Sequence, residues 1–246
     1  MMMRILDRFV DPADHLALDE ASLMRPDPDR DNGSSEMPDL LRIWEFKTPV
    51  VVAGRSTRIE EEIDTSLCRE RRIPVLRRCS GGASIVAGPG CLMYSVVLSH
   101  RGREHLKKID VAHEHVMSRV LQAAQRQIAD LELQGVCDLT WRNRKCSGNS
   151  LRVTRSHVLY HGTLLYDFDL ELLSGCLREA PRQPDYRQGR NHSDFVTNLP
   201  IQPQSFSDDL AAIFHVDGQI DAESFADEIR RLREQRYDSQ AWHLRH

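Results

Sequence analysis

The sequence has no long hydrophobic segment. Its longest apolar run, residues 91–98, includes Tyr94 and Ser95 and is far shorter than the roughly 20 residues that a membrane-spanning helix needs. The amino terminus reaches Arg4 and Asp7 too early for the apolar core of a secretory signal. These absences argue against a membrane or secreted protein, and we expect a soluble protein of the cytoplasm.

The sequence also lacks an excess of positive charge and any pairing of its cysteines. There are 33 Lys and Arg against 37 Asp and Glu, a formal net charge of −4, so no overall field attracts nucleic acid or an anionic membrane. Any phosphate must be bound by local groups. The six cysteines are scattered, with no Cys-x-x-Cys pair, which indicates reduced thiols rather than a disulfide framework.

Three common catalytic motifs are absent. No Gly-x-x-x-x-Gly-Lys-Ser/Thr sequence occurs, so the protein has no P-loop. No Gly-x-Ser-x-Gly nucleophile elbow occurs either. His113 and His115 lie two residues apart in a predicted helix and face different sides of it, which argues against zinc binding there. The chemistry must come from other groups of residues.

What is present is the composition of an ordinary globular domain, 40% hydrophobic and 28% charged. No internal repeat or linker divides the chain. Asp11 before Pro12, and Asp169, are typical helix N-caps. Periodicity predicts helices over residues 12–24, 59–72, 110–133 and 221–236, a loop over 25–38, and strands over 40–46, 49–53, 73–78, 84–86, 91–98, 138–141, 151–153 and 158–168. We therefore expect one α/β (α+β) domain, a mixed β-sheet flanked by helices.

The first segment that could carry chemistry runs from Arg77 to Ser84. Two adjacent arginines, Arg77 and Arg78, end a predicted strand, and the small residues of a Ser-Gly-Gly-Ala loop follow at once. Successive backbone N–H groups in such a loop can form an anion-binding nest, and an arginine can clamp a phosphate or carboxylate through two donors. The alternative is a Gly-rich hairpin turn with two solvated arginines.

Two further segments follow. Lys145 precedes Cys146, Ser147 and Gly148, which places a cation beside a backbone that a ligand could approach, although a simple turn also explains the pattern. His161 and Gly162 interrupt an apolar strand, where glycine is unfavourable unless a bulge or a ligand requires it. A hydrogen-bonded core histidine beside a bulge is the alternative.

Two cysteines are candidate nucleophiles. Cys137 and Cys146 lie close to Lys145 in the sequence, and a neighbouring ammonium group lowers the pKa of a thiol. The alternative is an inert thiol, as most cysteines in reduced proteins are.

The order and spacing of these segments resemble the lipoate–protein ligase A family, the biotin/lipoate protein ligase catalytic domain, and its octanoyl- and lipoyl-transferase relatives. About 65 residues separate the Ser-Gly-Gly loop from Lys145, and 16 more lead to His161. The resemblance extends over about residues 13–200. It also includes Leu16-Ala17-Leu18-Asp19-Glu20, Trp44 with Val50-Val51-Val52-Ala53-Gly54-Arg55, Asp138-Leu139, and Phe195-Val196-Thr197-Asn198-Leu199.

The resemblance implies a chemistry. Such a ligase activates lipoate with ATP, giving an acyl-adenylate and pyrophosphate, and passes the acyl group to a lysine of a lipoyl-acceptor domain. Lys145 would contact the acyl carbonyl and the α-phosphate, where a fixed cation stabilises growing charge. Mg²⁺ would accompany ATP, with Asp138 best placed to help hold it. The other residues implied in binding are Arg78, Ser80, Gly81, Gly82, Ala83, Ser84, Ile85, Val86, Gly148, His161 and Gly162.

Departures from the family pattern leave alternatives open. Ala83 replaces a third glycine, Ala87-Gly88 replaces a His-Asp, and Cys137 stands where ligases commonly have Asn. The transferase relatives use a cysteine thioester and no ATP, so an octanoyl or lipoyl transferase acting through Cys137 is the second hypothesis. A non-catalytic lipoyl-binding protein is the third.

The expected organisation is a single catalytic domain over residues 1–246, with a helical C-terminal extension at 201–246 and no accessory C-terminal domain. This fits a ligase that needs a separate accessory subunit, a complete ligase, or a transferase. The acid, whether lipoate, octanoate or another, and the acceptor protein are not set by these motifs.

Overall fold

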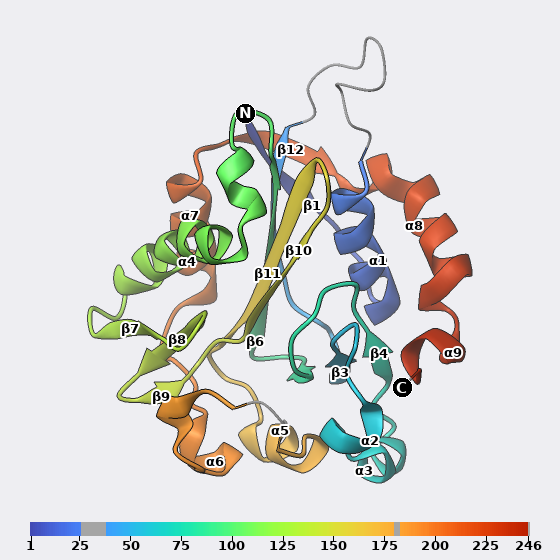
Figure 1. Ribbon diagram of the computed structural model, residues 1–246, viewed down its shortest axis with the longest axis vertical. Coiled ribbons are helices and arrows are strands. Elements are labelled where there is room, and N and C mark those ends of the chain that lie inside the picture. Colours follow the sequence, from blue (N-terminus) through green and yellow to red (C-terminus); the bar gives the residue numbers. More distant parts are fainter. Residues whose placement is uncertain (26–37, 180–182, 246) are drawn as a thin grey trace.

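The computed structural model describes residues 1–25, 38–179 and 183–245 and centres on a six-stranded mixed sheet (Figure 1). β1 is parallel to both of its neighbours, β2 and β12, whereas β2, β6, β11 and β10 pair antiparallel. This confirms the predicted mixed sheet. Its spatial order is β10 (Asn149–Val153), β11 (His157–Leu165), β6 (Cys91–Ser99), β2 (Asp39–Trp44), β1 (Met2–Leu6) and β12 (Val216–Asp221).

Two small sheets stand beside the large one. In the first, β3 (Val50–Ala53) lies between β4 (Val75–Arg77) and β5 (Ile85–Ala87). In the second, β8 (Asp138–Trp141) lies between β7 (Leu131–Gln134) and β9 (Arg144–Lys145). The first small sheet carries the Arg77–Ser84 loop and the second carries Lys145, so the two predicted segments approach the large sheet from different sides.

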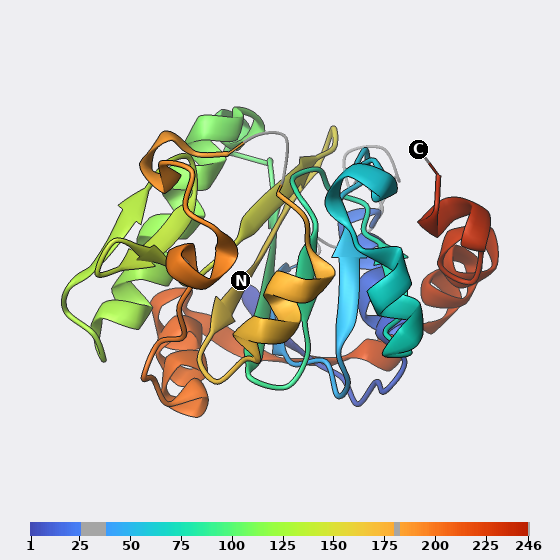
Figure 2. The same ribbon diagram turned by 90° about the horizontal axis from the view of Figure 1, so that it is seen from below.

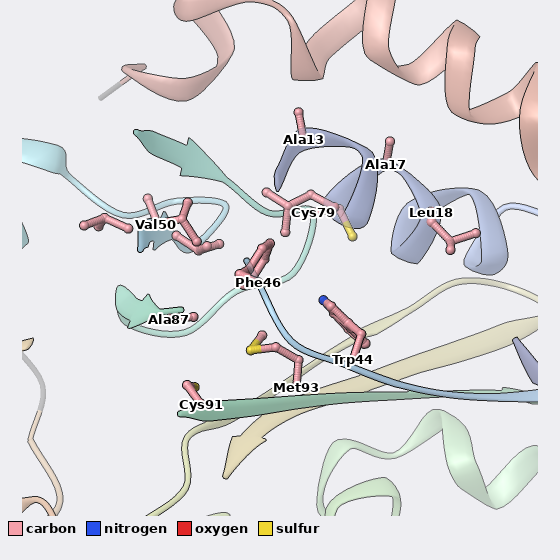
Figure 3. Packing of buried hydrophobic residues seen from close by; sticks show 14 of the residues in the cluster. Ala13, Ala17, Leu18, Trp44, Phe46, Val50, Cys79, Ala87, Cys91 and Met93 are labelled. Carbon is pink, nitrogen blue, oxygen red and sulfur yellow. The ribbon is translucent and has the colours of Figure 1, made fainter. Parts of the chain in front are cut away.

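Helices cover both faces of the large sheet. α1 (Pro12–Leu23) and α8 (Ala226–Leu232) pack on one face, and α4 (Ile109–Gln125) and α7 (Pro203–Ile213) on the other (Figure 1). Every residue of β11 is buried as a result. Figure 3 shows Trp44, Phe46 and Met93 in the core beneath α1. No helix within the described ranges is long and apolar enough to cross a bilayer.

Short helices close one end of the molecule. α2 (Ile59–Glu62), α3 (Thr65–Glu70), α5 (Leu170–Cys176) and α6 (His192–Phe195) lie along its lower edge in Figure 1, and Figure 2 views them from below. α9 (Gln240–His243) lies beside β4. The described residues also form three 3₁₀ segments, Glu104–Lys107, Asp185–Arg187 and Ala222–Phe225, and a π-helical turn, Arg233–Tyr237.

The predicted caps are confirmed. Asp11 accepts a hydrogen bond from the Ala13 N–H with Pro12 at the first helical position, and Asp169 accepts from the Leu172 N–H. The predicted loop over 25–38 falls almost wholly on residues 26–37, which lie outside the described residues.

Four predicted elements are wrong in extent. The helix predicted over 59–72 is two helices, because Ile63 has an extended backbone and forms a β-bridge with Leu177. Asp64 then caps the second helix. The helix over 110–133 ends at Gln125, because residues 131–134 pair with β8. The strand over 158–168 ends at Leu165. Within the predicted helical extension at 201–246, residues 216–221 instead form β12 beside β1, a tertiary pairing that the local pattern around Gly218 did not reveal. Of the helix predicted over 221–236, only residues 226–232 form a regular α-helix.

A buried arginine ties α1 to the sheet. Arg42 of β2 is only 1% exposed; its Nε donates to Asp7 Oδ2 at 2.7 Å and its Nη1 to Asp19 Oδ1 at 3.3 Å. Burial by itself would raise the pKa of Asp7, but the Arg42 charge and hydrogen bond hold it below its usual value. The pair is therefore ionised, and each charge depends on the other.

Replacing Arg42 by methionine should lower the free energy of unfolding by about 3–5 kcal/mol, because the buried carboxylates of Asp7 and Asp19 would lose the arginine charge that compensates them. Chemical denaturation of the two proteins measures the difference. The control is Arg230→Gln, which removes an ion pair whose side chains are 68% and 96% exposed and should cost less than about 1 kcal/mol. Equal losses in the two variants would contradict this account.

Candidate active-site cavity

A cavity of about 200 Å³ opens where the two small sheets meet the large one. One part of its wall is apolar, with Leu16, Trp44, Val52, Val86, Met93 and Leu165. Another part is polar, with Arg78, Lys145, Asn149, His161, Arg187 and His192. An amphipathic ligand with an apolar chain and an anionic head matches such a wall.

The two adjacent arginines of the first segment have different surroundings. Arg77 is not part of the cavity wall and donates to the carbonyls of Gly54, Thr57 and other residues, including Arg245 near the end of the chain. Arg78 lines the cavity, yet its Nε donates to Ser80 Oγ and its Nη groups donate to the carbonyls of Val52, Gly81 and Ala83. Arg78 therefore shapes the loop as well as the wall.

Only some residues of the segment 80–86 line the cavity. Ala83, Ser84, Ile85 and Val86 line the cavity, whereas Ser80, Gly81 and Gly82 are not part of the wall. Gly82 has φ +82°, a conformation that favours glycine. Its carbonyl oxygen lies so close to Gly54 that a Cβ on Gly54 would be only 1.9 Å from that oxygen. The glycines thus allow two backbones to touch, and their predicted role in binding stays a prediction.

A buried chain of hydrogen bonds joins the Ser80-Gly81-Gly82 loop to the large sheet. His161 Nδ1 lies 2.8 Å from Asp19 Oδ2, and His161 Nε2 lies 2.6 Å from Ser80 Oγ. Because a carboxylate only accepts, Nδ1 carries the proton, and in the neutral ring Nε2 accepts from the Ser80 hydroxyl. Asp19 and His161 also line the cavity. The predicted His161 and the unpredicted Asp19 therefore act together.

Gly162 is required by its neighbours. A Cβ at this position would lie 1.8 Å from Asn149 Oδ1 and 2.7 Å from Tyr94 Oη, which hydrogen-bond one another at that point. Any side chain would separate them. The glycine in the strand therefore marks a close approach in the cavity wall rather than a bulge.

Lys145 lines the cavity from β9 with its side chain 29% exposed. Its Nζ lies 2.7 Å from Asp138 Oδ1, and Asp138 Oδ2 accepts from the Tyr186 hydroxyl at 2.8 Å. Burial and the Asp138 charge raise the pKa of Tyr186, so its hydroxyl keeps its proton and donates it. Gly148 follows nearby, its N–H bonded to Thr163 Oγ1. The ammonium is thus held at the cavity by a fixed carboxylate.

The same geometry bears on the predicted metal role of Asp138. Both of its oxygens already have partners, and within the described part of the chain no group of three or more His, Cys, Asp or Glu residues could hold a metal ion. These residues do not suit a metal ion held by protein ligands alone. Mg²⁺ that accompanies ATP needs only one or two carboxylates beside the phosphates, so that role of Asp138 stays a prediction.

The Lys145 charge acts to lower the pKa of both thiols, as expected, but too little to activate either of them. Burial, reinforced by the Asp138 charge, raises the pKa of Cys137 to about 11 and that of Cys146 to about 12, and Lys145 offsets this only in part. The Cys137 thiol lies 3.6 Å from the Asn149 carbonyl oxygen, and neither cysteine is part of the cavity wall. The lysine is paired with Asp138 instead, a partner that sequence proximity did not reveal.

Sequence reasoning also missed several wall residues. Glu62, whose carboxylate accepts from the Ser84 N–H at 2.7 Å, comes from α2. Arg178, Arg187 and His192 come from the segment after α5. Their signal in the sequence is a cluster of Arg, Pro and His between residues 178 and 192, which has no regular period.

Alkylation of native Cys137 should be slow at pH 7 and accelerate about tenfold per pH unit through pH 10, because only the thiolate reacts and its pKa is raised. Intact mass after timed iodoacetamide treatment measures the rate, and Cys137→Ser should remove the signal, since the other five cysteines are buried. A rate that levels off near pH 8 would contradict the raised pKa.

Comparison with known proteins gives the family. A family model described as the lipoyl protein ligase A/B catalytic domain matches residues 11–213. The lipoate-protein ligase LplJ of Bacillus subtilis is 27% identical over 170 residues, which cover 68% of this chain and 46% of LplJ. The octanoyltransferase LipM of Bacillus cereus is 24% identical over 271 residues, which cover 95% of this chain and 94% of LipM.

The fold has solved counterparts. A bi-partite lipoate protein ligase from Thermoplasma acidophilum, described with its E2 lipoyl domain, superposes with a TM-score of 0.78 at 20% identity, over 98% of this chain and 95% of that one. This confirms the predicted biotin/lipoate ligase catalytic fold. The chain spans between 34% and 62% of the length of the first three curated ligases that it matches. Because one family model covers most of the sequence, the chain belongs to the lipoyl protein ligase A/B catalytic domain family.

Proposed function

We propose that the protein activates lipoate, or a similar acid such as octanoate, with ATP and transfers the acyl group to a lysine of a lipoyl-acceptor domain. The observation that carries this proposal is Lys145, whose ammonium lines the cavity 2.7 Å from Asp138, while the Cys137 thiol does not line it and keeps its proton. The family and the ligase relatives support it.

In the first step of this reaction, a carboxylate oxygen of the acid attacks the α-phosphorus of ATP and pyrophosphate leaves. Negative charge grows on the phosphoryl oxygens, and the Lys145 ammonium would stabilise it. Asp138 and Tyr186 fix the position of that ammonium. The apolar wall, with Leu16, Trp44 and Met93, suits the acyl chain and keeps water from the mixed anhydride.

In the second step, the neutral amine of the acceptor lysine attacks the acyl carbonyl, the bond to the AMP oxygen breaks, and AMP leaves with its charge. The amine loses a proton as the amide forms. Lys145 would again face the oxygen that gains charge. We propose that one catalytic domain carries both steps and that the binding residues are those of the Arg78–Val86 loop, Gly148 and the His161-Gly162 pair. A separate accessory subunit and a cytoplasmic location stay predictions.

With lipoate and Mg-ATP, the protein should release pyrophosphate, and Lys145→Gln should slow the release by about 100- to 1,000-fold, the usual cost of losing one group that stabilises transition-state charge. Glutamine keeps a donor toward Asp138, so the melting temperature should change little. Lys107→Gln, an exposed lysine in a 3₁₀ turn, is the matched control and should behave as the wild type. Unchanged release in the Lys145 variant would refute the role of this residue, and ligand binding without release would indicate a binder.

The second candidate is an ATP-independent octanoyl or lipoyl transferase through a Cys137 thioester. The length of the match favours it, because LipM aligns over 94% of its sequence and LplJ over only 46%. The thioester would need the Cys137 thiol to lose its proton and to reach the cavity. The raised pKa of Cys137 and its place outside the wall make this the weaker candidate.

Incubation with an octanoylated carrier protein, without ATP, separates the two candidates. We expect the intact mass of the protein to stay unchanged, because the Cys137 thiol is protonated near neutral pH. Cys137→Ser should retain ATP-dependent acylation of an acceptor domain. A hydroxylamine-sensitive acyl adduct on the wild type, absent from Cys137→Ser, would favour the transferase.

A further inference from the structure

Arg187 is a buried cation of the cavity wall that forms no ion pair within the described ranges, although the charge of Glu179 acts on it and offsets part of the lowering of its pKa by burial. Arg187 ends the 3₁₀ turn Asp185–Arg187, is only 4% exposed, and lines the cavity. Its Nε donates to the Arg190 carbonyl at 2.7 Å, and its guanidinium stacks 5.0 Å from the Phe195 ring centroid. Its Nη2 is buried and has no hydrogen-bond partner among the residues that the structure describes. One face of the guanidinium is therefore fixed, and one donor group is unused.

No carboxylate within the described ranges forms an ion pair with Arg187. A guanidinium does not release its proton at ordinary pH, and a buried charge without a counter-ion is costly. Burial accordingly lowers the pKa of Arg187. An anionic ligand in the cavity would satisfy both the charge and the free Nη2 donor.

The rest of the wall is also rich in cations. Arg78, Lys145 and Arg178 line the same cavity, against the carboxylates of Asp19 and Glu62. Asp19 already holds Arg42 and His161, and Glu62 holds the Ser84 N–H. Lys145 is paired with Asp138, and Arg178 Nη2 lies 3.9 Å from Asp64 Oδ2, so Arg78 and Arg187 are the wall arginines without an ion pair among the described residues.

His192, also in the wall, has its pKa lowered by burial and by the charges of Arg187 and Lys145, while the charge of Glu179 raises it in part. Arg187, Lys145 and His192 therefore lie close enough to act on one another. A ligand with several negative charges fits this part of the wall better than a single carboxylate.

Arg187 is linked to Lys145 through Tyr186, the residue that precedes Arg187 in the sequence. Tyr186 donates to Asp138, which holds the Lys145 ammonium, and the Thr197 N–H donates to the Lys145 carbonyl. Arg190, three residues on, donates to the Asn143 carbonyl. The segment 184–197 and the β8–β9 hairpin are thus joined at several points, so Arg187 keeps a fixed relation to the lysine.

We propose that Arg187 binds the outer phosphates of the nucleotide, the pair that leaves as pyrophosphate. This inference rests on the proposed function, in which Lys145 faces the α-phosphate; the β- and γ-phosphates are then the next anionic groups. A planar guanidinium with a free Nη2 suits two phosphate oxygens at once. Arg187 would hold the leaving group while Lys145 stabilises the reacting phosphoryl group.

The test compares Arg187→Gln and Arg187→Lys with Arg190→Gln. Arg190 belongs to the same segment and also stacks on Phe195, but it donates to carbonyls and does not line the cavity. The measurements are the KM for ATP, the KM for lipoate, and direct calorimetric binding of inorganic pyrophosphate. Pyrophosphate binding does not depend on turnover.

Arg187→Gln should weaken pyrophosphate binding and raise the KM for ATP by about 10- to 100-fold, the usual effect of one charged hydrogen bond. The KM for lipoate should stay within about twofold, Arg187→Lys should recover part of the loss, and Arg190→Gln should leave pyrophosphate binding unchanged. A rise in the KM for lipoate alone would assign Arg187 to the acid instead and overturn the inference. Equal losses in Arg187→Gln and Arg190→Gln would do the same, since they would show a loosened segment.

The two proposals fail in different ways. If the wild type binds pyrophosphate through Arg187 but never consumes ATP, the proposed ligase activity is wrong and the anion site stands. If the wild type consumes ATP and Arg187→Gln binds pyrophosphate as well as the wild type does, the ligase activity stands and the role of Arg187 is wrong.

Discussion

The cavity depends on a buried chain of polar groups that runs from the large sheet to the Ser-Gly-Gly loop. Arg42 holds Asp19, Asp19 holds His161, His161 meets Ser80, and Ser80 accepts from Arg78. Each link is buried, so each polar atom needs the next to avoid the cost of lost hydration. This mutual dependence fixes β2, α1, β11 and the loop in one arrangement, which a set of apolar contacts alone would specify less tightly.

The opposite wall is held by a second, more exposed set of bonds. The Lys145–Asp138–Tyr186 contacts join β8 and β9 to the segment after α5, and that segment carries Arg187 and His192. The first wall presents groups that are already satisfied, whereas the second presents an unused donor and excess positive charge. A ligand that combines an apolar chain with phosphate would complete both, and this complementarity underlies the proposed acyl-adenylate chemistry.

The two cysteines illustrate how burial outweighs proximity. Lys145 is next to Cys146 in the chain, yet both thiols have raised pKa values, because loss of hydration and the Asp138 charge exceed the attraction of the ammonium. The choice between ligase and transferase therefore depends on which residues reach the cavity. Lys145 does and Cys137 does not.

The sequence by itself determined the features that depend on neighbours along the chain. Asp11 and Asp169 cap helices, the buried strands are mainly apolar, and the ordered motifs around Ser80, Lys145 and His161 indicate the family. Tertiary structure decided the rest. It formed β12 beside β1, gave Arg77 and Arg78 different partners, paired Lys145 with Asp138, and buried the Nη2 group of Arg187 without a hydrogen-bond partner among the described residues. These outcomes depend on groups far apart in the chain and on how much water packing removes, and neither quantity has a local signature in the sequence.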